Sequence, residues 1–321
     1  GHSVDSANLK NDALIIAGTL DCSSIGSAPY SLVLSAPDTG YLKFDLHVDH
    51  ASIGRTGLVF ESAATERIFG FGEQYSAFDL KGKRVPIYVE EQGLARGAQP
   101  LSRLLDELAE GLAGEWYQTY APVPFFTTTR HRAMVLENAE FSTFDLRDEK
   151  QIAFEVYSNR LTARLISGDT PLDIIERYTS FAGRMRELPG WILEGAILGL
   201  QGGTERTLTA VDALEKANGK LSAVWLQDWV GQRDTKYGVR LWWNWVLDQD
   251  RYEDWSGMVS DLARRDIRVL GYINPYLVDI ALKADSTQRN LYREAFDKGY
   301  LLKKKEGTLA TVNQGGWYAY I

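Results

Sequence analysis

The hydrophobic pattern changes character once along the chain, and this change most constrains the fold. From about residue 12 to 166 the apolar residues come in short or alternating runs separated by turn residues, as at 13–17, 30–34, 41–46, 57–60, 133–136 and 152–157. Such runs are typical of an antiparallel β-sandwich. After residue 190 apolar strands and helical segments alternate instead, which is typical of a parallel sheet. We therefore expect two domains of different architecture.

A helical segment lies between the two patterns. Residues 170–187 have a helical period, Pro171 suits a position in the first turn of a helix, and the Pro189-Gly190 pair ends it. Within the sandwich region, the leucine spacing over 101–112 also predicts a helical insertion. We expect an N-terminal sandwich domain over 1–168, a helical linker over 169–189 and a third region over 190–321.

The third region predicts strands at 196–200, 223–226 and 269–273, with helices near 205–217 and 252–265. The strands are continuous apolar runs, so we expect them to be parallel and covered on both faces. A (β/α)8 barrel needs about 250 residues, yet this region has 132. We therefore interpret it as the first part of a (β/α)8 barrel that continues after Ile321; a smaller α/β fold is the alternative.

Charge and composition exclude several classes of partner. The net charge of −8 argues against a nucleic-acid-binding protein, because such proteins carry a basic face. No segment approaches the roughly 20 apolar residues that a membrane-spanning helix requires. Cys22 is the single cysteine, so no internal disulfide can form, and Gly1-His2-Ser3 resembles the remainder of a cleaved tag. We expect a cytoplasmic protein with no membrane or nucleic-acid partner, and the sequence leaves a homo-oligomer open.

Polar side chains follow each of the three strands predicted after residue 190. These are Gln201 after the first strand, Gln227 and Asp228 after the second, and Asn274 after the third. Because the carboxyl ends of parallel strands meet at one edge of the sheet, where active sites form, we expect them to line one pocket. The alternative is that each caps the following helix or holds a loop.

The loop over 230–245 combines positive charge with aromatic residues. Arg233, Lys236 and Arg240 outnumber the single acidic residue Asp234, and tryptophans occupy positions 242, 243 and 245. A cationic loop at the mouth of a barrel suggests an anionic group on the substrate, and arginine suits an anion with several oxygens. The alternative is a solvated surface loop, which the density of tryptophans argues against.

Five strings in this sequence resemble glycoside hydrolase family 31, in its sulfoquinovosidase branch. They are Phe69-Gly70-Phe71-Gly72-Glu73-Gln74, Gln201-Gly202-Gly203-Thr204, Trp225-x-Gln227-Asp228-Trp229, Arg240-x-x-Trp243-Asn244-Trp245 and Tyr272-Ile273-Asn274-Pro275-Tyr276. The resemblance runs from about residue 60 to 321. It implies a sandwich of the galactose-mutarotase-like kind before the barrel.

The resemblance also implies a substrate and a binding site. Ordinary α-glucosidases of the family have an acidic residue where this chain has Gln227. A carboxylate would repel a sulfonate, whereas an amide can donate a hydrogen bond to it. Gln227, Arg240 and Trp243 would then hold the sulfonate of sulfoquinovose, while Gln201 and Asp228 would meet the sugar hydroxyls or brace these three residues.

Family 31 enzymes are retaining, which requires a nucleophilic carboxylate and an acid/base carboxylic acid about 5 to 5.5 Å apart. In the family both are aspartates on later barrel strands, so this chain contains neither and both are expected after Ile321. We expect no cofactor and no metal, because the four histidines have no metal-ligand spacing. Two alternatives remain: another family 31 α-glycosidase, such as an α-glucosidase or α-xylosidase, and a sugar-binding protein without turnover.

Overall fold

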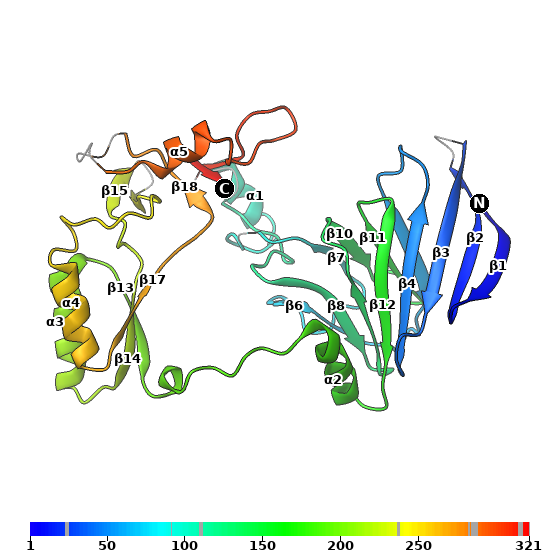
Figure 1. The fold of residues 1–321 in the computed structure, drawn as a ribbon, viewed down its shortest axis with the longest axis horizontal. Coiled ribbons are helices and arrows are strands. Elements are labelled where there is room, and N and C mark those ends of the chain that lie inside the picture. The colour runs from blue at the N-terminus through cyan, green and yellow to red at the C-terminus, as the bar shows by residue number, and fades with distance from the viewer. Residues whose placement is uncertain are drawn as a thin grey trace. The chain divides into compact units, whose positions relative to one another are not determined.

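The computed structural model describes residues 1–22, 26–90, 92–108, 112–235, 238–281, 283, 288–313 and 317–320. It is made mostly of β-sheet, and contacts within the chain divide it into two compact units, Gly1–Met185 and Arg186–Ile321. Figure 1 shows the strands and helices of both units.

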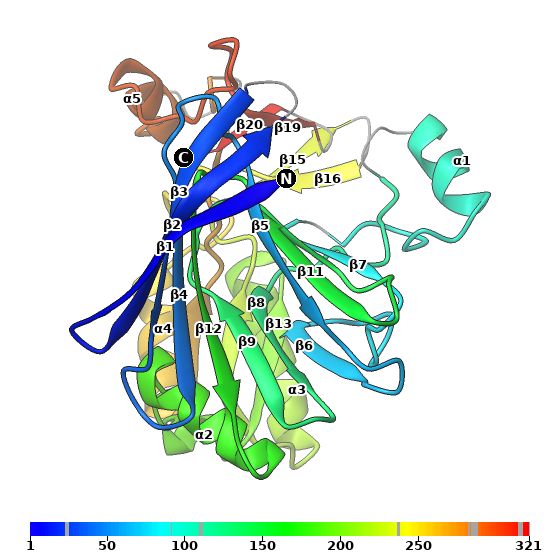
Figure 2. The ribbon, with the colours of Figure 1, turned by 90° about the vertical axis from the view of Figure 1, so that its right-hand side faces the viewer.

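The larger sheet of the first unit has eight antiparallel strands. In spatial order they are β1 (His2–Lys10), β2 (Ala13–Cys22), β3 (Gly26–Ser35), β4 (Tyr41–Val48), β12 (Arg160–Ser167), β9 (Arg132–Leu136), β8 (Pro122–Thr128) and β6 (Ile68–Gly72). Figure 2 shows β1 to β4 and β12 side by side. The alternating runs at 13–17, 30–34, 41–46 and 133–136 all lie within these strands, which confirms the predictions for those segments.

A second antiparallel sheet contains β5 (Thr56–Glu61), β11 (Gln151–Val156), β10 (Ser142–Asp145) and β7 (Arg84–Ile87), in that order. One hydrophobic core draws residues from both sheets. Phe71 of β6 contacts Phe126 of β8 and also Phe144 of β10 in the second sheet, with ring centroids 5.5 and 5.0 Å apart. Rings of this size bury much apolar surface, so they hold the two sheets together.

The string Phe69-Gly70-Phe71-Gly72 forms an irregular part of β6. The register with β8 shifts between Gly70 and Gly72, whose φ angles are 126° and 79°. A Cβ on Gly72 would lie 2.0 Å from the carbonyl oxygen of Ala121. Glycine is therefore required where the bulge turns the fully buried Phe71 into the core.

Two helices belong to the first unit. The first is α1 (Leu101–Leu108), at the start of the predicted insertion over 101–112, of which residues 109–111 lie outside the described part of the chain. The second is α2 (Pro171–Ala182), which begins with Pro171 and a capping box between Thr170 and Asp173. Tyr178 of α2 stacks on Phe125 at 4.2 Å, so the helix of the predicted 169–189 linker packs on the larger sheet.

The second unit begins with the short 3-10 helix η1 (Gly190–Leu193) and contains a three-stranded parallel sheet. Its strands, in spatial order, are β13 (Ala196–Leu200), β14 (Leu221–Leu226) and β17 (Arg268–Gly271), and the connecting helices are α3 (Gly203–Lys216) and α4 (Trp255–Arg264). Val211 of α3 and Leu262 of α4 share one core with Val224 of β14. Figure 1 shows both helices together beside the sheet.

The strand and helix predictions of this unit are confirmed, with two differences. We expected the strands to be covered on both faces, but in the described residues Ile197 of β13 is 42% exposed. The loop after β14 also contains an antiparallel hairpin, β15 (Gln232–Thr235) and β16 (Gly238–Leu241), which the sequence did not reveal because its alternation is short and polar. The remaining elements are β18 (Tyr276–Leu277), α5 (Leu291–Asp297), β19 (Thr311–Asn313) and β20 (Trp317–Tyr320).

No helix among the described residues is both long enough and apolar enough to cross a membrane.

Candidate functional site

The three parallel strands end at one common edge. Leu200 of β13 pairs with Leu226 of β14, which pairs in turn with Gly271 of β17. The residues that follow these strands therefore start side by side. Gln201 donates from Nε2 to Oε1 of Gln227 at 2.6 Å, so two of the predicted site residues are in direct contact.

The turn that carries Gln201 into α3 depends on two glycines. Gly202 and Gly203 have φ angles of 120° and 86°, and a Cβ on Gly203 would lie 2.1 Å from the carbonyl oxygen of Arg251. Only glycine fits both the backbone angle and this close approach. The string Gln201-Gly202-Gly203-Thr204 therefore brings the end of β13 against the segment before α4.

Asp228 lies beside this turn, and its side chain is completely buried. Its Oδ2 accepts a hydrogen bond from the Gly202 amide at 2.8 Å and forms an ion pair with Arg251 Nε. Its Oδ1 accepts from the Tyr252 hydroxyl. Both carboxylate oxygens thus face protein donors, which compensates the cost of burying the charge.

Tyr252 remains a donor because of its surroundings. Burial raises the pKa of its hydroxyl, and the hydrogen bond to the ionised Asp228 raises this pKa further. A neutral phenol can donate to a carboxylate, whereas a phenolate would repel it. Tyr252 therefore stabilises the buried charge of Asp228.

A chain of amide hydrogen bonds extends from Arg251 to Gln227. Arg251 NH2 donates to Gln232 Oε1 at 2.9 Å, and Gln232 Nε2 donates to Gln201 Oε1 at 2.8 Å. Sequence reasoning missed Gln232, Arg251 and Tyr252. An aspartate that is buried at the end of a strand needs a cationic partner, and this was the one signal in the sequence for such a residue. The neighbouring residues did not show which arginine this partner would be.

The cationic loop forms the β15–β16 hairpin, in which Arg233 pairs directly with Arg240. Side chains alternate along a strand, so Arg233 and Arg240 leave one face of the hairpin and Gln232 leaves the other. Arg240 donates to the carbonyl oxygen of Val239 at 3.0 Å, and Arg233 lies 4.8 Å from the centre of the Trp242 ring. Lys236, also predicted for this loop, lies outside the described residues.

The tryptophans after the hairpin return to the ends of the strands. Trp243 lies 5.4 Å from Tyr272, the first residue after β17, and Tyr272 lies 5.8 Å from Trp225 of β14. Trp242 is buried against Val278 and Ile280. The loop is therefore packed onto the strand-end edge, in agreement with the argument that so many tryptophans do not occupy a solvated loop.

Asn274 leaves a polar atom open in the same region. Its Oδ1 accepts from the Tyr276 amide at 3.0 Å, whereas its Nδ2 is buried and has no hydrogen-bond partner among the described residues. A buried N–H group without an acceptor destabilises a folded protein, so this Nδ2 atom is a candidate to donate to a further group. The described residues contain no group of three or more His, Cys, Asp or Glu side chains that could hold a metal ion.

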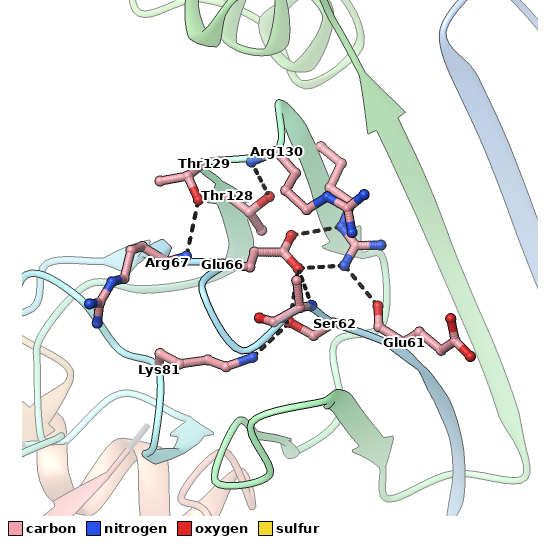
Figure 3. Close-up of polar contacts among 10 residues, drawn as sticks. Glu61, Ser62, Glu66, Arg67, Lys81, Thr128, Thr129 and Arg130 are labelled. Carbon is pink, nitrogen blue, oxygen red and sulfur yellow. Dashed lines mark hydrogen bonds and ion pairs between the residues drawn. The ribbon is translucent and has the colours of Figure 1, made fainter.

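The first unit contains a second buried carboxylate, that of Glu66, with a cluster of polar side chains around it (Figure 3). Arg132 binds it through two hydrogen bonds of 2.8 and 2.7 Å, and Ser62 donates to Oε2 at 2.8 Å. Burial raises the pKa of Glu66, but the hydrogen bonds from Arg132, Thr128 and Ser62 outweigh it and lower the pKa to about 2.

The Glu66 network ends on protein groups. Arg132 donates further to the carbonyl oxygen of Glu61 at 2.8 Å, and Lys81 donates to the Ser62 hydroxyl at 2.7 Å. Every partner is part of the first unit, and the carboxylate has no exposed surface. We interpret this network as structural.

Comparison with known proteins gives a consistent result. Residues 195–321 match the family described as glycosyl hydrolases family 31 TIM-barrel domain. The chain is 32% identical over 288 residues to the sulfoquinovosidase of Escherichia coli, an alignment that covers 90% of this chain and 41% of the relative. It is 31% identical over 264 residues to the sulfoquinovosidase of Agrobacterium fabrum, covering 82% of this chain and 38% of the relative.

Two further matches complete the comparison. A family 31 sulfoquinovosidase from E. rectale, solved with an aza-sugar inhibitor, has a TM-score of 0.85 and 27% identity, covering 100% of this chain and 46% of that one. The α-xylosidase XylQ of Lactiplantibacillus pentosus is 24% identical over 250 residues, which cover 76% of this chain and 28% of the relative. The chain thus spans less than half the length of each of these proteins.

Proposed function

Because this chain belongs to glycoside hydrolase family 31, we propose that the complete protein is a retaining α-glycosidase that hydrolyses α-sulfoquinovosides. Substrates such as sulfoquinovosyl glycerol or sulfoquinovosyl diacylglycerol would release sulfoquinovose. Two relatives that align over most of this chain are named sulfoquinovosidases, which supports this substrate. The proposed partner is therefore a small sulfonated sugar, and the proposed location is the cytoplasm.

The observation that carries the proposal is the direction of the Gln227 amide. Its Oε1 already accepts from Gln201, and no described residue accepts a hydrogen bond from its Nε2. A sulfonate is permanently negative and can only accept hydrogen bonds. A strand-end position that presents an N–H, where a carboxylate would present only oxygens, therefore favours an anionic group on the sugar.

We propose that Arg240 and Trp243 complete the sulfonate site. Arg240 donates to the Val239 carbonyl, and a sulfonate would be a stronger acceptor because the hydrogen bond would join two charged groups. Trp243 lies against Tyr272 at the strand-end edge, where its indole N–H would add a third donor. Gln201 and Asp228 would act next to this site, Asp228 through the groups that it orients.

The reaction proposed for the complete protein is a double displacement. A carboxylate attacks the anomeric carbon while a carboxylic acid protonates the leaving oxygen, and water then cleaves the glycosyl-enzyme bond with retention of configuration. We place both carboxylates, as aspartates, in the part of the barrel that follows residue 321. In this division of roles, residues 1–321 supply the substrate's binding groups.

We also propose the finer architecture that these roles require. The two sheets that share the Phe71 core would be a galactose-mutarotase-like β-sandwich, and β13, β14 and β17 would be the first strands of a (β/α)8 barrel. The exposed face of β13 supports this proposal, because later strands of a barrel would cover it with side chains.

The test compares two substrates on the full-length protein. A chromogenic α-sulfoquinovoside should be hydrolysed with a kcat/KM at least about 100-fold above that of the matching α-glucoside, a ratio expected when a charged group is specifically recognised. Equal rates would reject the proposal in favour of another family 31 α-glycosidase. Tight binding of the sulfonated sugar without turnover would instead select a sugar-binding protein.

A further inference from the structure

Three glutamine side chains form a directed chain of hydrogen bonds between Arg251 and the proposed sulfonate site. The first is Gln232, which accepts from Arg251 and donates to Gln201. Gln201 in turn donates to Gln227. The three bonds are 2.9, 2.8 and 2.6 Å long, so each amide lies within ordinary hydrogen-bond distance of the next.

The direction of the whole chain follows from the chemistry of its first member. An arginine guanidinium donates hydrogen bonds and cannot accept them, so Gln232 must turn its oxygen towards Arg251. Its nitrogen then faces Gln201, which must offer its own oxygen. By the same rule Gln201 turns its nitrogen to the oxygen of Gln227. The Nε2 of Gln227 is therefore the atom left to face a ligand.

Arg251 is itself held in place by a buried charge. Its Nε pairs with Oδ2 of Asp228, whose side chain has no exposed surface; the Gly202 amide donates to the same oxygen and the Tyr252 hydroxyl to Oδ1. The backbone amide of Arg251 also donates to Asp248 at 3.1 Å. The guanidinium thus has a fixed position. Because each amide side chain can rotate, the direction of the whole chain is defined only if the group at one end is fixed.

We propose that Arg251, Gln232 and Gln201 are positioning residues that determine specificity: they orient the Gln227 amide so that it presents a donor and selects a ligand group that only accepts hydrogen bonds. This inference rests on the proposed function. It adds that the choice between a sulfonate and a neutral hydroxyl is set by Arg251, which is separated from the sugar by the side chains of Gln232, Gln201 and Gln227.

The test reverses the chain with a nearly isosteric change in the full-length protein. In the Gln232→Glu variant the carboxylate can accept from Arg251 but cannot donate to Gln201. Gln201 then donates to residue 232 and offers its oxygen to Gln227, which turns its own oxygen towards the ligand. We expect the ratio of kcat/KM for the α-sulfoquinovoside to that for the α-glucoside to fall about 10- to 100-fold, the value of one hydrogen bond to a charged group.

Two further variants separate orientation from charge and from folding. Gln249→Glu adds the same charge on an exposed side chain two positions from Arg251 and should leave the ratio within about 3-fold, because exposed charges are screened. Gln232→Met removes both hydrogen bonds of residue 232 without adding charge. It should lower the ratio by less than Gln232→Glu, since the amides of Gln201 and Gln227 lose their fixed direction without being reversed.

Each result has a separate meaning. If Gln232→Glu slows both substrates by the same factor, or if Gln249→Glu lowers the ratio as much, the orienting role is rejected while the proposed function stands. If the wild-type protein does not prefer the sulfonated substrate, the proposed function and this inference are both rejected. Thermal melting of each variant should show a folded protein, so that a loss of activity through unfolding is recognised.

Discussion

The two units of this protein each bury a carboxylate against an arginine, and the two networks differ in where they lead. Glu66 in the first unit and Asp228 in the second both have side chains with no exposed surface. From Arg132 the first network extends to the carbonyl oxygen of Glu61 and to the face of the Phe60 ring. From Arg251, which pairs with Asp228, hydrogen bonds between amide side chains lead to Gln227 at the ends of the strands.

This comparison shows that a buried ion pair does not by itself identify a binding site. The carboxyl with a pKa lowered to about 2 is Glu66, which lies in a network that extends only to groups of the first unit: the Glu61 carbonyl, the Ser62 hydroxyl and the Lys81 ammonium. What separates the two is the atom left without a partner in the described residues, Nε2 of Gln227.

Asp228→Asn should be the most damaging change, because it removes the negative charge that pairs with Arg251 and replaces one of the two acceptor oxygens with an NH2 donor. We expect the free energy of unfolding of the second unit to fall by about 4 kcal/mol, as for other broken buried pairs. We also expect the preference of the full-length protein for the sulfonated substrate to be lost. Urea melts and substrate ratios would check this, and destabilisation with an unchanged ratio would make Asp228 as purely structural as Glu66.

Arg240→Ala should affect binding but not folding. Removing one member of a buried charge pair weakens transition-state binding by roughly 2 to 5 kcal/mol, so kcat/KM for the α-sulfoquinovoside should fall by at least about 30-fold. The neutral α-glucoside should be nearly unaffected, because it has no sulfonate for the guanidinium to meet. Equal losses with both substrates would show that Arg240 holds the hairpin and does not contact the sugar.

Glu66→Gln should show the opposite pattern, with lower stability and unchanged specificity. The change weakens the paired hydrogen bonds from Arg132 and should cost about 3 kcal/mol of unfolding free energy in the first unit. The matched control is Arg147→Gln, which breaks the exposed pair with Asp145 and should leave the melting temperature unchanged. A shift in the substrate ratio of the Glu66→Gln variant would contradict the structural interpretation.

Acid should weaken the first unit through the same carboxyl, with the smallest effect of the four. The pKa of Glu66 is lowered from 4.5 to about 2 on folding. Its contribution to the free energy of unfolding is therefore complete at pH values above 4.5, the pKa in the unfolded chain. That contribution is lost as the pH falls towards the folded pKa. Between pH 5 and pH 3 the loss should be about 2 kcal/mol. Urea melts over this range should show it, and the Glu66→Gln variant should lack this part of the pH dependence.

Local patterns in the sequence were sufficient for the strands of the parallel sheet and the helices that connect them. The strand predicted at 196–200 has the same bounds as β13, and the helix predicted near 205–217 is α3 (Gly203–Lys216). These predictions depended on periodicity and on capping residues, which act between neighbours in sequence. The same reasoning placed Gln201 and Gln227 at adjacent strand ends, because the register of a parallel sheet aligns them.

The partners of the buried charges could not be predicted in this way. Glu66 meets Arg132 from 66 positions away, and Gln232 meets Gln201 from 31 positions away. Nothing in the local sequence marks these residues, since glutamine and arginine are common on solvated loops. Only the path of the chain between them determines which side chains come together.

The sequence by itself therefore determined the change from alternating strands to strand–helix units, and it determined that polar residues follow the parallel strands. Only the tertiary structure decided that Asp228 holds Arg251, that Arg251 orients three amides, and that Gln227 is left to present an N–H. The physical reason is that secondary structure follows from short-range periodicity, whereas the direction of an amide depends on donors brought together by the fold.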